Sequence, residues 1–296
     1  MAIKECFVRI VELFREGAPF ISLEFFPPKE TVDWPGFFRV VDRLRSINPL
    51  FVSVTYGAGG GTQAHSLEIV TRLKTEFDLE PMAHLTCVGA TERNITGFLE
   101  ELSAAGVDNV LALRGDPPQD ANAPLVLGKD FTYASDLVAF IRKHYPLMGI
   151  GVAGYPEGHP EAACQEKDLD ALKYKLDLGG DFVVTQLFFD NAYYWEFVRR
   201  ARSVGITRPI IPGVMPIFSL RVIKKVLSLC GATIPAELLR NLEQAQEKGG
   251  PEAVQALGIE YARRQIRGLL DAGAPGVHLY TLNRDDACLE LLKDIF

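Results

Sequence analysis

An acidic residue stands among apolar residues near the start of the chain, in the sequence SLEFFPPKE (22–30). Glu24 lies between Leu23 and two phenylalanines, and two prolines end the run. Apolar surroundings disfavour the ionised carboxylate, so they raise its pKa and make the group a competent general acid near neutrality. The alternative is a structural Glu24 paired with an Arg or Lys.

A second group of chemically capable residues is Arg114, Gly115 and Asp116 in the sequence LALRGDPP (111–118). Glycine lets a flat ligand approach the backbone closely. Arginine offers a bidentate donor and aspartate an acceptor to the edge of a heteroaromatic ring. A local Arg–Asp pair that closes a turn is the simpler alternative.

A third group follows the sequence GYPEGHPEA (154–162), which contains Tyr155 and His159. Asp168 and Lys175 come next, two turns apart on one face of an expected helix. Alone, such a pair is usually a solvated surface pair. Together with the other groups, it indicates a site for a large, planar and polar ligand.

Eight short apolar runs must position these residues, and amphipathic segments separate them. The runs cover residues 20–26, 50–57, 81–87, 109–116, 148–156, 182–190, 209–216 and 276–283. This alternation predicts parallel strands joined by helices, and eight such units predict an α/β fold of the (β/α)8 TIM-barrel type. A doubly wound open sheet is the alternative. Between the last two runs, three helical segments are expected, of which the last two form an extra hairpin (234–250 and 251–273).

Polar residues recur on one face of several predicted strands, because side chains alternate between the two faces. The pairs that share a face are Ser22 with Glu24, Ser53 with Thr55, His84 with Thr86, Arg114 with Asp116, and His278 with Tyr280. The opposite positions are mostly apolar, as with Leu111 and Leu113. If the polar face points inward, it forms a polar cup at the carboxyl end of the barrel, where barrel enzymes place their active sites.

The overall composition excludes several classes of protein. The 296 residues are 48% hydrophobic and 23% charged, with a net charge of −7, which argues against nucleic-acid and anionic-membrane partners. No apolar run is long enough for a membrane helix. Five scattered cysteines and five histidines show no metal-ligand spacing. We expect an amphipathic helix over residues 1–17, one catalytic domain over 1–296, and a cytoplasmic protein without a metal.

Nine motifs in order resemble the methylenetetrahydrofolate reductase family, in its compact bacterial form. They are EFFPPK, VSVTYGAGG, AHLTC, LALRGDPP, YASDL, GYPEGHPEA, TQLFFD, IIPGVMP and HLYTLNR. The resemblance implies an FAD-dependent enzyme that reduces 5,10-methylenetetrahydrofolate to 5-methyltetrahydrofolate. NADH or NADPH would reduce the flavin first, and the two substrates would use one site in turn.

The resemblance also assigns residues. Glu24 is similar to the general acid that protonates N10 of the folate, and Asp116 to the acid near the pterin and flavin. The implied FAD contacts are Thr55, Tyr56, Ala58, His84, Arg114, Gly115, Asp116, Ala134, Tyr155, His159, Ala162, Asp168 and Lys175. The implied substrate contacts are Gln186, Leu220, Tyr280 and Arg284. Leu220 stands where some members have Phe, and Ala171 and Tyr174 replace polar residues near the far end of the cofactor.

Two other functions are compatible with these residues. One is a flavin-bearing barrel subunit that works with a redox partner protein and a different electron donor. The other is a non-redox pterin-binding barrel enzyme. The resemblance implies small-molecule substrates and a homo-oligomer, and it leads us to expect no regulatory domain of the longer eukaryotic type.

Overall fold

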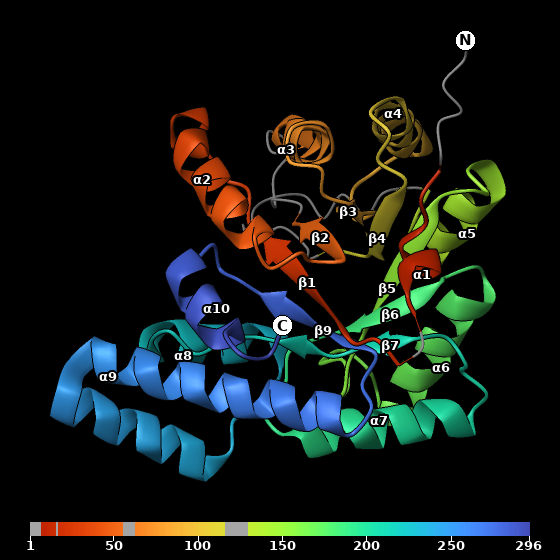
Figure 1. The fold of residues 1–296 in the computed structure, drawn as a ribbon. Helices are drawn as coiled ribbons and strands as arrows, with labels where there is room; N and C mark the ends of the chain where they lie inside the picture. The colour runs from red at the N-terminus through yellow and green to blue at the C-terminus, as the bar shows by residue number, and fades with distance from the viewer. Residues whose placement is uncertain (1–6, 16, 56–62, 116–129) are drawn as a thin grey trace, which may run out of the picture.

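The computed structural model describes residues 7–15, 17–55, 63–115 and 130–296. In these residues nine strand segments form one parallel sheet in the order β7-β6-β5-β4-β3-β2-β1-β9-β8 (Figure 1). The strands are β1 (Phe20–Phe25), β2 (Phe51–Val54), β3 (Pro81–Thr86), β4 (Asn109–Leu113), β5 (Gly149–Gly154), β6 (Phe182–Thr185), β7 (Ile210–Ile211), β8 (Gly213–Val214) and β9 (Gly276–Tyr280).

The sheet closes on itself at Pro212. Strand β7 pairs with β6, whereas β8, which begins one residue after Pro212, pairs with β9 at the other end of the strand order. Proline has no N–H group to donate to a neighbouring strand. The Pro212 carbonyl nevertheless accepts a hydrogen bond from His278 N at 2.9 Å. The predicted seventh strand is therefore one strand interrupted by a proline. The TIM-barrel prediction is confirmed over the open sheet.

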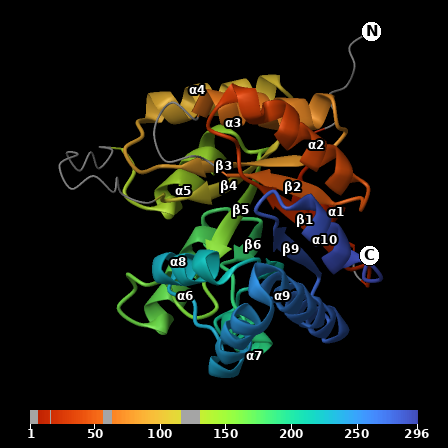
Figure 2. The ribbon, with the colours of Figure 1, turned by 90° about the vertical axis from the view of Figure 1, so that its left-hand side faces the viewer.

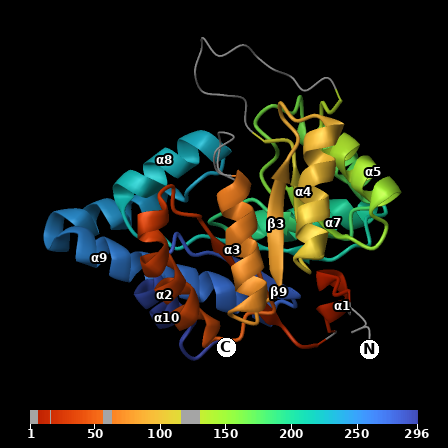
Figure 3. The same ribbon diagram turned by 90° about the horizontal axis from the view of Figure 1, so that it is seen from above.

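Helices cover the outside of the strands, and Figure 2 shows α2, α3 and α4 on one side of the barrel and α6, α7, α8 and α9 on the other, while Figure 3 gives the view from above. The described helices are α1 (Ile10–Leu13), the 3₁₀-helix η1 (Thr31–Asp33), α2 (Trp34–Arg45), α3 (Gln63–Thr75), α4 (Glu92–Ala104), α5 (Ala134–His144), α6 (Gln165–Asp177), α7 (Asn191–Ser203), α8 (Leu220–Cys230), α9 (Ala236–Asp271) and α10 (Asp285–Leu292).

Helix α4 illustrates why these segments are helical. Thr91 Oγ1 accepts from the backbone N–H of Asn94 at 3.2 Å, and the Asn94 side chain accepts from the backbone N–H of Thr91 at 3.3 Å. This reciprocal cap satisfies N–H groups that a helix start leaves without partners. Ile95, Phe98 and Leu102 then recur at helical spacing and are buried.

Large apolar side chains fill the amino-terminal half of the barrel. The members of this inner cluster are Ile10, Phe20, Phe51, Met82, Leu111, Phe182, Val184 and Ile211. Phe51 and Phe182 come from separate strands, and their ring centroids lie 6.1 Å apart. Leu111 belongs to this inner cluster and Leu113 packs against it, so the prediction that they lie on the outer face is wrong. Strand β4 ends at Leu113, and Arg114 belongs to the loop that follows.

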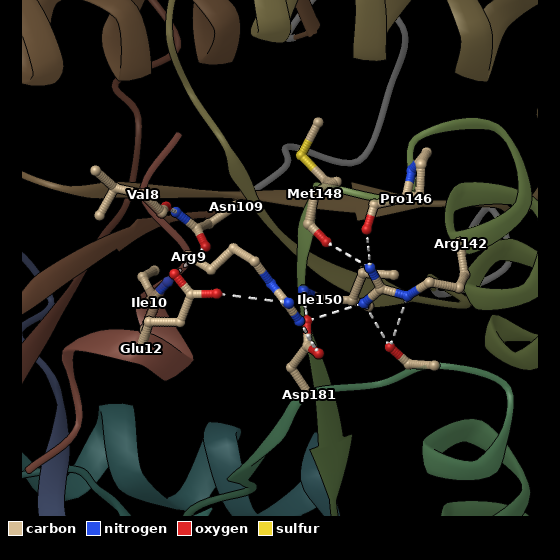
Figure 4. A network of polar contacts seen from close by, with 11 residues as sticks. Val8, Arg9, Ile10, Glu12, Asn109, Arg142, Pro146, Met148, Ile150 and Asp181 are labelled. Carbon is tan, nitrogen blue, oxygen red and sulfur yellow. Dashed lines mark hydrogen bonds and ion pairs between the residues drawn. The ribbon is translucent and has the colours of Figure 1, made fainter. Parts of the chain in front are cut away.

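The amino-terminal segment closes the floor of the barrel (Figure 4). The carboxylate of Asp181, just before β6, binds the guanidinium of Arg9 and accepts from Arg142 Nη2 at 2.9 Å and from Ile150 N at 2.8 Å. Asn109 accepts from the backbone N–H of Ile10 at 2.8 Å. These contacts hold an extended segment with only four helical residues, so the amphipathic helix expected over 1–17 is wrong for the described part.

The extra hairpin before the last strand is present. Helix α9 contains non-helical backbone at Gly250 (φ 66°, ψ −158°), where it folds back on itself. The hairpin packs on the loops that follow β6 and β8, through an apolar cluster of Leu187, Phe189, Met215, Ile217, Ile223, Ala232, Leu238, Leu242 and Val254. Gly258 permits this close approach, because a Cβ there would lie 1.9 Å from Ile217 O. The sixth predicted strand is consequently shorter than expected, and its apolar end belongs to the loop.

Candidate active site

Five polar side chains from four strands meet at the carboxyl end of the barrel, and we call them the Glu24 cluster. Its members are Ser22, Glu24, Ser53, His84 and His278. Strand register places them together, because Glu24 is aligned with Ser53 on β2, and Ser22 with His278 on β9. All five are at most 8% exposed. The inward polar face predicted for these strands is confirmed.

Glu24 is contacted by two imidazole rings. Its Oε2 atom lies 3.3 Å from His84 Nε2 and 3.5 Å from His278 Nε2. Ser53 Oγ donates to the same oxygen at 3.3 Å. The carboxyl group therefore sits in a dry setting with basic partners on two sides.

This environment changes the expected protonation of Glu24. Burial raises the pKa of its carboxyl group, as the apolar neighbours in sequence suggest. Hydrogen bonding and electrostatic attraction between the carboxylate and the rings of His278 and His84 outweigh burial and lower the pKa to about 2. The expectation of a raised pKa is wrong, because the two histidines are distant in sequence. The partner is also neither Arg nor Lys.

His278 is the residue whose importance the sequence did not reveal. Its ring is fully buried and stacks on Phe51, with centroids 5.8 Å apart and planes 13° from parallel. Its Nδ1 lies 2.8 Å from Ser22 Oγ, and its Nε2 lies 3.2 Å from Ser53 Oγ. In the sequence, His278 shares one strand face with Tyr280. This pattern predicted that His278 points inward, but it did not predict that its partner is Glu24.

The backbone around Glu24 is held by the loop between β9 and α10. Thr281 Oγ1 donates to Glu24 O at 2.6 Å. The Asn283 amide donates to Phe26 O at 2.7 Å and accepts from Phe26 N at 3.1 Å. Leu282 and Asn283 both have left-handed backbone, with φ of 47° and 56°. We call Thr281, Leu282 and Asn283 the β1 clamp.

The loops after β4 and β5 are joined by an ion pair. Arg114 donates to both carboxylate oxygens of Glu161, at 2.5 and 2.8 Å. Gly115 has φ of 85°, a conformation that favours glycine. Asp116, like Tyr56 and Ala58, lies outside the described residues. Thr55 directly follows β2 and donates its N–H to Phe25 O at 3.0 Å.

Helix α6 contributes a half-buried pair to the same end of the barrel. Lys175 Nζ donates to Ala153 O at 2.7 Å, and Asp168 Oδ2 accepts from His159 N at 3.2 Å. Burial lowers the pKa of Lys175 to about 8, and the Asp168 charge opposes this. Burial likewise raises the pKa of Asp168. The solvated surface pair weighed as the alternative is therefore wrong.

The other residues expected at the cofactor lie near these two. The rings of Tyr155 and His159 are in edge contact, with centroids 4.6 Å apart. Ala162 donates its N–H to His159 O at 2.9 Å, and Ala134 is the first residue of α5.

The four residues expected to contact substrate come from different elements. Gln186 follows β6, and its Oε1 accepts from Leu187 N at 2.9 Å. The Tyr280 hydroxyl donates to Thr185 O at 2.7 Å. Leu220 is the first residue of α8 and packs against the apolar cluster beneath the α9 hairpin. Arg284 is exposed, and its guanidinium carbon lies 5.9 Å from the Phe218 ring centroid.

The donor set around the loops after β4 and β5 suits a flavin dinucleotide. Arg114 and Lys175 supply cations for a pyrophosphate, and Asp168 supplies an acceptor for a hydroxyl group. The buried Nε2 of His84 lies 3.3 Å from Glu24 Oε2 and makes no other hydrogen bond within the described residues. These residues therefore fit the implied cofactor.

Two classes of site receive no support from the described residues. Among them, no group of three His, Cys, Asp or Glu side chains is arranged to hold a metal ion. In the same part of the chain, no helix is long and apolar enough to cross a membrane.

The parallel closed sheet with a polar cluster at its carboxyl end defines the class of TIM-barrel proteins with an enzyme-type site. The chain belongs to the methylenetetrahydrofolate reductase family, because the model of that family matches residues 9–295.

Individual relatives agree with this assignment. The chain is 39% identical over 297 residues to methylenetetrahydrofolate reductase (NADH) 1 of Arabidopsis thaliana, covering 97% of this chain and 50% of that protein. It is 34% identical over 269 residues to 5,10-methylenetetrahydrofolate reductase of Pectobacterium carotovorum, covering 91% of this chain and 87% of that protein. The chain thus spans about half the length of the plant relatives.

A solved structure supports the fold alone. An uncharacterised protein from Clostridium thermocellum that binds two copies of 5-methyl-5,6,7,8-tetrahydrofolic acid has 13% sequence identity. It superposes with a TM-score of 0.65 and covers 97% of each chain.

Proposed function

We propose that this chain reduces 5,10-methylenetetrahydrofolate to 5-methyltetrahydrofolate, with a reduced nicotinamide nucleotide as electron donor and FAD as cofactor. The observation that carries the proposal is the buried Glu24 between His84 and His278, at the carboxyl end of a barrel of this family. The proposed catalytic unit is the single barrel.

The reaction needs a proton at N10 of the folate when the bond between N10 and the bridging carbon breaks. Glu24 is the proposed donor, because its carboxyl group is held at the strand ends in a water-poor setting, where it passes on a proton that it must first receive. Loss of that proton leaves the Glu24 carboxylate, and opening of the ring leaves an iminium cation at N5. The negative charge of the cluster stabilises this cation, and Asp116 is proposed to add to the effect.

FAD, when bound, supplies the hydride that the iminium carbon accepts. Arg114 and Lys175 are proposed to hold its phosphates, and Asp168 a ribose hydroxyl. Thr55, His84, Tyr155 and His159 would contact other parts of it, together with Tyr56, Ala58, Gly115, Ala134 and Ala162. The phosphates would compete with Glu161 for Arg114, because that carboxylate already accepts from Nη1 and Nη2 of the guanidinium.

The folate is proposed to lie between the Glu24 cluster and the apolar cluster on which the α9 hairpin packs. Gln186 and Arg284 would donate to its polar groups, and Leu220 would pack against its ring system. The Tyr280 hydroxyl is bound to Thr185 O, so we propose that Tyr280 acts through its ring face.

An anaerobic titration followed by visible absorption tests the function. We expect a yellow protein that NADH or NADPH bleaches and that 5,10-methylenetetrahydrofolate recolours. Bleaching only after addition of a second protein would favour the subunit of a larger redox complex. A protein that binds no flavin when FAD is supplied in excess would contradict the proposal and favour a non-redox pterin enzyme.

A further inference from the structure

The lowered pKa of Glu24 creates a chemical problem for a proton donor, since a carboxyl group with a pKa of about 2 is ionised near neutrality. We infer that His278 is a positioning residue that stores a proton beside Glu24 and returns it to the carboxylate in each turnover. This inference rests on the proposed function.

Each serine beside His278 also has a second acceptor for its hydroxyl proton. Ser22 Oγ lies 2.8 Å from His278 Nδ1 and 3.4 Å from Val277 O. Ser53 Oγ lies 3.2 Å from His278 Nε2 and 3.3 Å from Glu24 Oε2. When the two hydroxyls donate to Val277 O and Glu24 Oε2, their lone pairs face both ring nitrogens, so the site has an acceptor for each N–H of a doubly protonated imidazolium.

The packing around the ring fixes this arrangement. Phe51 stacks on His278 in a nearly parallel orientation, and Tyr280 meets the ring edge-on with centroids 5.5 Å apart. The ring cannot turn without leaving both serines. Its negative partner is the Glu24 carboxylate, 3.5 Å away. A charge buried this completely requires such a partner.

The proton transfer balances with one solvent proton per turnover. The Nε2–H bond of the imidazolium breaks as its proton passes to Ser53 Oγ, and the Ser53 hydroxyl proton passes to Glu24 Oε2, which leaves neutral imidazole and a neutral carboxyl. The carboxyl then gives its proton to N10 of the folate. A proton from solvent returns to Nε2 and restores the imidazolium before the next turnover.

Other titratable groups face the same cluster. Among the described residues these are His84 from β3, at 3.3 Å from Glu24, and Tyr280 from β9. Burial raises the pKa of Tyr280, and the charges of Glu24, Tyr155 and Cys230 act in the same direction. His84 lacks the aligned partners that hold His278, so it is the weaker candidate for storage.

Nitrogen-15 NMR of the flavin-bearing protein, labelled only at its five histidines, tests the inference directly. The variant His278→Gln identifies the His278 signals. We expect both ring nitrogens of His278 to be protonated near neutral pH. In Ser22→Ala we expect a change in the Nδ1 signal that Ser22→Thr reverses. A neutral His278 ring in the wild-type protein would overturn the inference.

Rapid-reaction kinetics supply the second readout. We expect His278→Gln to slow reoxidation of the reduced flavin by methylenetetrahydrofolate about 10- to 100-fold and to change its pH profile. Flavin reduction by the nucleotide should stay within about twofold of wild type, and the surface variant His144→Gln should match wild type in both steps. An unchanged folate step and pH profile in His278→Gln would overturn the inference. If the wild-type protein shows no folate step, the proposed function fails, and the NMR spectrum still decides where the proton lies.

Discussion

At the scale of the residue, Lys175 differs from the other lysines of helix α6. Lys167 and Lys173 form exposed ion pairs within the helix, with Asp170 and Asp177. Lys175 instead points its ammonium group at a backbone carbonyl beneath the loop after β5. Lys175 forms no salt bridge with a carboxylate in the described part of the chain, and such a partly desolvated cation is well placed to bind an anionic ligand.

We therefore expect Lys175→Met to weaken FAD binding. Loss of a charge-assisted hydrogen bond costs about 1.5–3 kcal/mol, or roughly a 10- to 100-fold rise in Kd. Because burial lowers the pKa of Lys175 to about 8, its ammonium form is lost above that pH. Wild-type affinity should thus fall as the pH rises through this value, and the variant should lose that part of the dependence. Fluorescence titration of FAD measures both effects.

Lys173→Met on the same helix is the matched control, because it removes an equal charge from an exposed pair. It should leave the Kd within about twofold. If both substitutions raise the Kd for FAD equally, Lys175 contributes only to the overall charge of the protein and does not contact the cofactor.

The residue types at the site were largely predictable, whereas their partners were not. The alternation of side chains correctly placed Ser22, Glu24 and His278 on the inward face. The partners of Glu24 come from strands about 60 and 250 residues away, and the pKa depends on those partners. Short motifs cannot specify such contacts before the barrel closes.

At the scale of the element, the β1 clamp fixes the end of the strand that carries Glu24. Asn283→Gly keeps the left-handed backbone but removes both hydrogen bonds to Phe26. We expect a loss of about 1–3 kcal/mol in the free energy of unfolding and a slower folate step. Urea denaturation and rapid-reaction kinetics measure the two effects.

Asn48→Gly is the control for this substitution. Asn48 also has left-handed backbone, with φ of 50°, but it is exposed and lies between α2 and β2. It should change stability by less than about 0.5 kcal/mol and leave the folate step unaltered. If Asn283→Gly behaves in the same way, the clamp has no role in holding Glu24.

Strand positions were easier to predict than strand ends. Every predicted apolar run contains a strand, but several continue into loops. In the run 182–190 the strand stops at Thr185, because Leu187 and Phe189 pack under the hairpin instead of extending the sheet. Apolar content alone cannot distinguish these two ways of burying a side chain.

At the scale of the whole molecule, the floor of the barrel depends on one buried carboxylate. Asp181 joins the amino-terminal segment, helix α5 and strand β5 (Figure 4). Asp181→Ala leaves Arg9 and Arg142 without their shared partner. We expect a loss of about 3–5 kcal/mol in the free energy of unfolding, measured by urea denaturation.

The active site lies at the opposite end of the barrel, so folded Asp181→Ala protein should reduce folate at the wild-type rate. Asp170→Ala, which breaks an exposed pair with Lys167, should cost less than about 1 kcal/mol. If both variants lose the same free energy of unfolding, the contacts of Asp181 with Arg9, Arg142 and Ile150 do not stabilise the barrel more than an exposed ion pair does.

The most direct test of the central claim is the folate step of Glu24→Gln, measured anaerobically with pre-reduced flavin. Glutamine keeps the shape of the side chain but cannot pass a proton to N10. We expect flavin reduction by the nucleotide to continue near the wild-type rate, while flavin reoxidation by methylenetetrahydrofolate falls by at least about 100-fold. Reoxidation at the wild-type rate would contradict the assignment of Glu24 as the proton donor.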